Sequence, residues 1–266
     1  MGTDSGNRRS RRDFIQATSG GAMGLLASGL LGASCRTGTD KASAPDPLLA
    51  RLDQGAPGPR TNVVVICTDD LGYGDTACYG APGHIEPNIT ALARGGTRFT
   101  SAYVAAPLCS PSRAALLTGR YPQRFGLEFN PGPPERCERL GLGLPTSENT
   151  MADLLKMAGY HTGLVGKWHL GSRPMFHPRQ RCFDEFFGFL HDQSIYLDPS
   201  DRADVHSVTT SSQRWFPRNR GKYQAIYRDT TMVREAEYLT DAFTREAVSF
   251  IERGAARPDP FFLYLS

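Results

Sequence analysis

The sequence has no Cys-x-x-Cys pair, no internal repeat and little net charge. The missing cysteine pairs leave zinc-ribbon and thioredoxin-like proteins without support. A net charge of +3 is small for 266 residues, and the basic residues gather near the N-terminus and in residues 214–222 instead of forming one long stripe. Nucleic-acid binding is therefore not expected. The cysteines are far apart in the chain, at Cys35, Cys67, Cys78, Cys109, Cys137 and Cys182.

The sequence also lacks an apolar run long enough to span a membrane. The longest apolar stretch, residues 22–33, is too short and too rich in glycine for a spanning helix. It follows a basic segment, and Ser-Arg-Arg-Asp-Phe-Ile at residues 10–15 resembles the twin-arginine export motif. We therefore expect residues 1–35 to be a signal peptide read by the twin-arginine (Tat) export machinery, and the protein to be periplasmic or extracellular.

Residues 31–35 partly resemble a bacterial lipobox, although the leucine stands one position too early. A lipid anchor on Cys35 therefore stays open. Residues 36–60 contain Ser, Pro, Gly and charged residues without apolar periodicity, which predicts a linker. Residues 61–266 then form the folded domain.

Apolar runs and helical patterns alternate along this domain. Residues 62–68 are almost entirely apolar, which is typical of a strand buried on both faces of a parallel sheet. The alternation predicts an α/β fold with a mostly parallel central sheet and helices on both faces. Residues 126–148 read as a surface loop, and residues 172–238 as irregular loops over a site or as an insertion. The other expected strands are 99–104, 161–165 and 261–265, and the expected helices are 88–94, 112–118, 151–158 and 240–253.

Asp69 and Asp70 directly follow the first predicted strand, at a glycine-rich turn. Ligands bind at the carboxyl ends of strands in open α/β sheets, and adjacent carboxylates suit a hard cation. Taken alone, an Asp-Asp pair is more often used in turns and helix caps.

Residues 109–120 read Cys-Ser-Pro-Ser-Arg-Ala-Ala-Leu-Leu-Thr-Gly-Arg. This pattern predicts a helix beginning just after Cys109, where backbone amides and the helix dipole favour an anion. Arg113 stands one turn later and can bind the same anion. The pattern indicates a nucleophile in an anion pocket, although a lone cysteine before such a helix would more often be structural.

Cys-x-Pro-Ser-Arg followed by Ala-Ala-Leu-Leu-Thr-Gly-Arg resembles the signature of type I sulfatases, in the alkaline phosphatase-like superfamily. The resemblance covers residues 62–190 well and 240–266 more loosely. It implies that a formylglycine-generating enzyme oxidises Cys109 to formylglycine, whose hydrate attacks the sulfur of a sulfate ester. It also implies that Asp69, Asp70 and the modified Cys109 bind calcium.

Residues 166–171, Gly-Lys-Trp-His-Leu-Gly, match a second sulfatase signature. By this resemblance Lys167 contacts the sulfate, and His169 hydrogen-bonds the hydrate and takes a proton from it. His191 is a weaker candidate for substrate binding, because Leu190 stands where some sulfatases have a serine.

The family's second calcium pair, a further histidine and a further lysine lie beyond residue 266. We therefore expect an incomplete, truncated catalytic domain that is inactive alone. Two alternatives to a sulfatase stay open: a phosphonate or phosphate monoester hydrolase of the same superfamily, and a non-catalytic anion-binding remnant in which Cys109 remains a thiol. The sulfate ester, whether a sulfated sugar or an aryl or steroid sulfate, is not identified.

Overall fold

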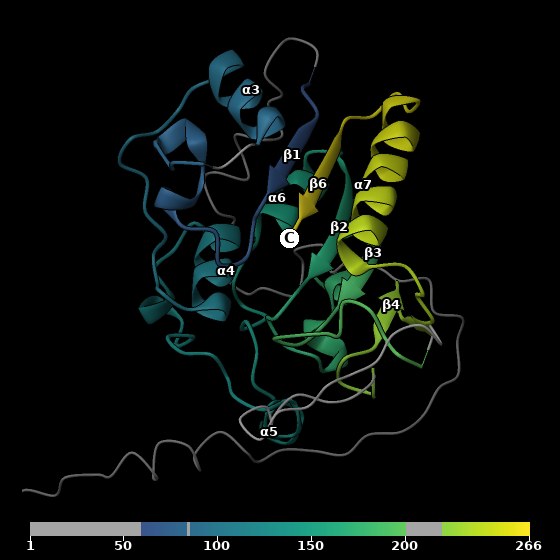
Figure 1. Ribbon diagram of the computed structural model, residues 1–266. Coiled ribbons are helices and arrows are strands. Elements are labelled where there is room, and N and C mark those ends of the chain that lie inside the picture. The colour runs from purple at the N-terminus through teal and green to yellow at the C-terminus, as the bar shows by residue number, and fades with distance from the viewer. Residues whose placement is uncertain (1–59, 84–85, 201–219) are drawn as a thin grey trace, which may run out of the picture. The chain divides into compact units, whose positions relative to one another are not determined.

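A six-stranded sheet forms the centre of the computed structural model, which describes residues 60–83, 86–200 and 220–266 (Figure 1). The chain divides into two units, residues 1–32 and 33–266, and every described residue belongs to the second. The predicted signal peptide, the lipobox and nearly all of the linker therefore lie outside the described residues. No helix in the described part is long and apolar enough to cross a membrane.

The sheet has the strand order β1-β6-β2-β3-β4-β5. The strands β1, β6, β2 and β3 are parallel, and β4 and β5 add an antiparallel edge. This arrangement confirms the predicted α/β fold with a mostly parallel sheet. Their bounds are Val63–Ile66 for β1, His161–Lys167 for β2, Glu185–Phe189 for β3, Ile226–Arg228 for β4, Thr231–Val233 for β5 and Phe261–Leu265 for β6.

Helices pack on both faces of the sheet, as predicted. On one face α7 covers β6, β2 and β3, and its Phe243 and Phe250 pack against Val165 and Leu263. On the other face α4 and α6 pack over Leu164 and neighbouring apolar residues. Figure 1 shows α7 on one side of the strands and α4 on the other. The helices are α3 (Pro87–Gly95), α4 (Cys109–Thr118), α5 (Pro134–Leu140), α6 (Met151–Met157) and α7 (Leu239–Ala255).

Local sequence explains where these helices begin and end. The Thr150 hydroxyl accepts from the Asp153 amide and the Asp153 carboxylate accepts from the Thr150 amide, which confirms the capping box expected before α6. Gly119 ends α4 in the left-handed conformation, at φ 65°. The helix α4 begins at Cys109 instead of Ser112, because Pro111 in its first turn needs no amide partner.

Several predictions about the chain's organisation are wrong. Residues 99–104 do not form a strand; Tyr103 and Val104 are exposed, and β propensity without a packing partner does not make a strand. The strand β1 is half-buried on one face and exposed on the other, where Ile66 is 62% exposed. Residues 126–148 contain α5, and residues 172–238 contain β3, β4 and β5.

Candidate active site

The carboxyl ends of β1 and β2 and the first turn of α4 bring together most of the predicted site residues. Asp69 and Asp70 lie in the turn after β1, and Lys167 is the last residue of β2. Asp70 has a positive φ of 54°, which the tight turn imposes on a non-glycine residue. Because parallel strands end at the same edge of the sheet, residues distant in sequence meet there.

Asp69 pairs with two cations. Its Oδ2 accepts a hydrogen bond of 2.8 Å from Lys167 Nζ, and its Oδ1 lies 3.4 Å from Arg113 Nη2. Burial alone would raise the pKa of Asp69, but the hydrogen bond and charge of Lys167 and the charge of Arg113 outweigh it and lower that pKa. The carboxylate is therefore ionised, and the three side chains together carry one net positive charge.

The two cations, Arg113 and Lys167, are much more deeply buried than the carboxylate of Asp69. The side chains of Arg113 and Lys167 are 4% and 7% exposed, whereas that of Asp69 is 43% exposed. The Arg113 guanidinium also donates to the Lys167 carbonyl oxygen at 3.3 Å and to the Ser266 hydroxyl. Burial strengthens the electrostatic interaction of the two cations with an anion, and hydrogen bonds fix the position of the guanidinium. This arrangement suits an anion such as a sulfate or phosphate group.

His169 follows β2 and is buried beside these cations. Burial, and then the positive charges of Lys167 and Arg113, lower its pKa to about 3, so the imidazole is neutral at neutral pH. Its Nδ1 is buried and has no hydrogen-bond partner among the described residues. A buried neutral imidazole with a nitrogen left over can exchange a proton with a bound substrate.

Cys109 is a partly buried free thiol and the first residue of α4. The next residue, Ser110, joins this turn to the loop after β2, because its hydroxyl donates to the His169 carbonyl oxygen at 2.7 Å. The backbone amide of Ser110 donates to Asn130 Oδ1 at 3.0 Å. Cys109 is thus held at a helix N-terminus next to the segment that carries His169.

His191 lies apart from this hydrogen-bonded cluster, in the loop after β3. It is buried, and its ring meets the Tyr223 ring edge-on at a centroid distance of 5.3 Å. Burial lowers its pKa, although the charge of Asp192 opposes the shift. When protonated, His191 would lower the pKa of His169 further, after burial and the charges of Lys167 and Arg113.

The carboxylates of Asp69 and Asp70 are the type of ligand that a hard cation binds, but two of them do not complete its coordination shell. Asp69 and Asp70 supply carboxylate oxygens, the ligands that calcium prefers, and calcium takes about six to eight oxygen ligands. In the described ranges no group of three or more His, Cys, Asp or Glu residues is arranged to hold a metal ion. The described residues therefore offer two adjacent carboxylates after β1, which are suited in chemistry to a hard cation but do not form a complete site.

Ser110 and Asn130 were not among the residues predicted from the sequence. Ser110 occupies a variable position of the Cys-x-Pro-Ser-Arg pattern, and Asn130 lies in a segment interpreted as a loop. Their contacts join segments distant in the chain, so no local pattern indicates them. A small polar residue beside a predicted nucleophile is the only hint that the sequence contains.

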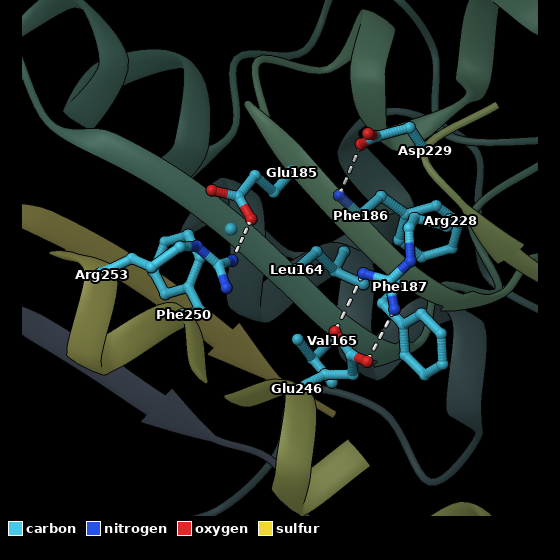
Figure 2. Close-up of a pocket in the computed structure, with 11 residues that line it drawn as sticks. Leu164, Val165, Glu185, Phe186, Phe187, Arg228, Asp229, Glu246, Phe250 and Arg253 are labelled. Carbon is cyan, nitrogen blue, oxygen red and sulfur yellow. Dashed lines mark hydrogen bonds and ion pairs between the residues drawn. The ribbon is translucent and has the colours of Figure 1, made fainter. Parts of the chain in front are cut away.

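A cavity of about 230 Å³ lies elsewhere, between α7 and the sheet (Figure 2). None of the predicted site residues lines it. Figure 2 shows Arg228 bound to Glu246 and Arg253 bound to Glu185, so both arginines of the cavity are already paired with carboxylates. This cavity is not a candidate for the anion site.

A family model and the curated relatives of this chain both indicate the same protein family. The family model described as Sulfatase matches residues 61–266. The chain is 41% identical over 220 residues to N-acetylgalactosamine-6-sulfatase of Mus musculus, covering 81% of this chain and 41% of that protein. It is 49% identical over 155 residues to arylsulfatase A of Homo sapiens, covering 56% of this chain and 30% of that protein.

Solved structures agree with this result. A crystal structure of Ps i-CgsB in complex with k-i-k-neocarrahexaose superposes with a TM-score of 0.65 and 37% sequence identity. The match covers 77% of this chain and 44% of that one. The chain thus spans about two fifths of the length of the first curated relatives that it matches.

Proposed function

Because the chain belongs to the sulfatase family, we propose that it contributes the nucleophile and the sulfate-binding residues of a sulfuric ester hydrolase. One observation carries the proposal: buried Arg113 and Lys167 converge on Asp69, beside the helix turn that begins with Cys109. Such a site holds an anion next to a nucleophile, which is what attack on a sulfate ester requires.

The nucleophile in this proposal is a formylglycine that a formylglycine-generating enzyme makes from Cys109. Hydrated, this group supplies one hydroxyl that attacks sulfur and displaces the alcohol of the ester. Loss of the proton from the second hydroxyl then re-forms the aldehyde and releases sulfate, which a thiol cannot do. Arg113 and Lys167 stabilise the negative charge of the sulfate. His169 is kept neutral by burial, so its free nitrogen can take a proton as sulfate leaves.

Calcium is the proposed metal. Asp69 and Asp70 are the ligands that the described chain offers, together with the modified residue 109. Bound calcium would offset the charge of the sulfate and polarise its oxygen. Asp69 is well suited to this role because its lowered pKa keeps the carboxylate ionised.

We propose a sulfated sugar as the substrate. The proposal is supported by similarity to an N-acetylgalactosamine-6-sulfatase and to a structure solved in complex with k-i-k-neocarrahexaose. His191 is the candidate for substrate contact, since it is buried in the loop after β3 and packs against the aromatic ring of Tyr223.

Residues 1–35 are the proposed twin-arginine signal, and the mature protein would be periplasmic or extracellular, with lipid attachment at Cys35 an open alternative. This route exports folded proteins, so Cys109 would be oxidised before export. Changing Arg11→Lys and Arg12→Lys together should leave mature enzyme in the cytoplasm. Normal export of that variant, measured by cell fractionation, would contradict the assignment.

The proposed activity is tested by comparing turnover of an aryl sulfate with turnover of the matching aryl phosphonate and aryl phosphate. Here and in the predictions below, the full-length protein is produced with a formylglycine-generating enzyme and supplied with calcium, and a Cys109→Ala variant is the control. The proposal predicts sulfate release that depends on Cys109 and exceeds phosphonate cleavage. Faster phosphonate cleavage would assign the site to that related class of hydrolase.

A further inference from the structure

Ser110 joins the first turn of α4 to two other segments. Its hydroxyl donates to the His169 carbonyl oxygen at 2.7 Å, and its backbone amide donates to Asn130 Oδ1 at 3.0 Å. The side chain is completely buried, whereas Asn130 is exposed. The residue after Cys109 is therefore fixed from two sides.

One of these hydrogen bonds pairs a free backbone amide, and the other restrains a strained residue. The first amides of a helix have no partner within the helix, and Asn130 supplies one for Ser110. His169 has a positive φ of 56°, a conformation that costs a non-glycine residue energy and persists only where its surroundings hold it. The Ser110 hydroxyl binds the carbonyl of that same residue. The bond therefore helps to hold His169 in its strained conformation.

We propose that Ser110 is a positioning residue that sets the place of His169 relative to residue 109, with Asn130 holding Ser110 itself. This inference rests on the proposed function, because the distance it fixes is that between the nucleophile and the proton-accepting imidazole. Reacting groups must be placed to within fractions of an ångström, and a misplacement of about 1 Å can cost about 100-fold in rate.

The test compares variants that remove one bond each. Ser110→Ala removes the bond to His169, and Asn130→Ala removes the bond to the Ser110 amide from the exposed side, where folding is not at risk. Thr118→Val is the matched control, since it removes a hydroxyl-to-carbonyl hydrogen bond of 2.7 Å at the other end of α4. Asn130→Asp restores an acceptor oxygen, and its negative charge is favourable at a helix N-terminus.

Turnover is divided by the formylglycine content of each sample, measured by peptide mass spectrometry, so that impaired maturation is not mistaken for impaired catalysis. We expect kcat to fall by about 10- to 100-fold in Ser110→Ala with little change in KM. A smaller fall is expected in Asn130→Ala, with recovery in Asn130→Asp and no fall in Thr118→Val. Normal kcat per formylglycine in Ser110→Ala would overturn the inference.

Amide hydrogen exchange tests the same inference without catalysis. The Trp168 and His169 amides donate to the Phe189 and Leu190 carbonyls. Ser110→Ala should speed exchange at these amides, and Thr118→Val should not. If the unaltered full-length protein released no sulfate, the proposed function would fail. Unchanged exchange in Ser110→Ala would overturn the positioning role itself.

Discussion

Lys167 Nζ lies 2.8 Å from Asp69 Oδ2 and so joins the carboxyl ends of two strands that are not neighbours in the sheet. The strand β6 runs between β1 and β2, and the ion pair spans the edge above it. Arg113 reaches the other oxygen of the same carboxylate from α4. Three segments far apart in the chain thus share one charged centre, with one positive charge in excess to bind an anion.

Replacing Lys167 should abolish most of the activity while leaving the fold intact. Lys167→Met keeps the length of the side chain but removes the charge, and we expect kcat/KM for an aryl sulfate to fall by about 100- to 1,000-fold. The control is Lys156→Met, which removes an ion pair with Asp184 outside the site and should cost at most about 1 kcal/mol of stability. Equal loss of activity in both variants would show that Lys167 acts through stability alone.

Removing calcium should lower both turnover and thermal stability. A chelator is expected to reduce sulfate release, and added calcium should restore it and raise the unfolding temperature, since a ligand that binds only the folded state stabilises that state. Asp70→Asn should weaken the rise in unfolding temperature, whereas Asp241→Asn on α7 should not. A calcium-dependent rise of the same size in Asp70→Asn and the unaltered protein would exclude Asp70 as a ligand.

His161 should make the free energy of unfolding depend on pH in the neutral to alkaline range. Hydrogen bonds to Asp184 and then to Glu185 raise its pKa from 6.5 to about 9, against the effect of burial. Its stabilising contribution is fully present below about pH 6.5 and is lost as the pH rises through about 9.

Urea unfolding measured at about pH 6 and about pH 9.5 tests this contribution. The free energy of unfolding should fall on the order of 1–3 kcal/mol more in the unaltered protein than in His161→Gln over this interval. The Lys156 and Arg253 ion pairs with Asp184 and Glu185 remain in both proteins, so the difference isolates His161. Equal falls in the two proteins would refute the raised pKa.

Gly163 should not tolerate a side chain. A Cβ atom there would overlap the Phe250 ring, which α7 packs against the sheet. Gly163→Ala should therefore destabilise the protein by about 1–3 kcal/mol, and Phe250→Leu should recover part of the loss. Gly95→Ala is the control, because a Cβ there meets nothing within 4 Å. A thermal unfolding midpoint unchanged by Gly163→Ala would contradict the packing described.

Local sequence was enough to predict the features that depend on neighbouring residues. The apolar run of residues 261–265 predicted β6, and the Thr150 and Asp153 side chains predicted the start of α6. The strands β4 and β5 are only three residues each, too short for a periodic pattern. The strand β3 is rich in phenylalanine, but it lies in a segment otherwise full of Arg, Asp and Ser.

The sequence predicted the individual residues of the site but not the contacts between them. Motifs indicated Asp69, Arg113 and Lys167, yet nothing local shows that both cations bind the same carboxylate. The Ser110–His169 bond joins residues 59 positions apart and depends on how α4 packs against the end of β2. Burial, which makes His169 neutral, is also a property of the folded chain alone.

The most direct test of the account is the mass of the tryptic peptide that contains Cys109, from protein made in cells that have a formylglycine-generating enzyme. Conversion of the thiol to an aldehyde removes the sulfur and lowers the mass by a fixed amount, and Arg113→Ala, which disrupts the recognised Cys-x-Pro-x-Arg pattern, is the control. The account predicts the aldehyde in the unaltered protein and the thiol in that variant. Only unmodified cysteine at residue 109 in the unaltered protein would contradict it.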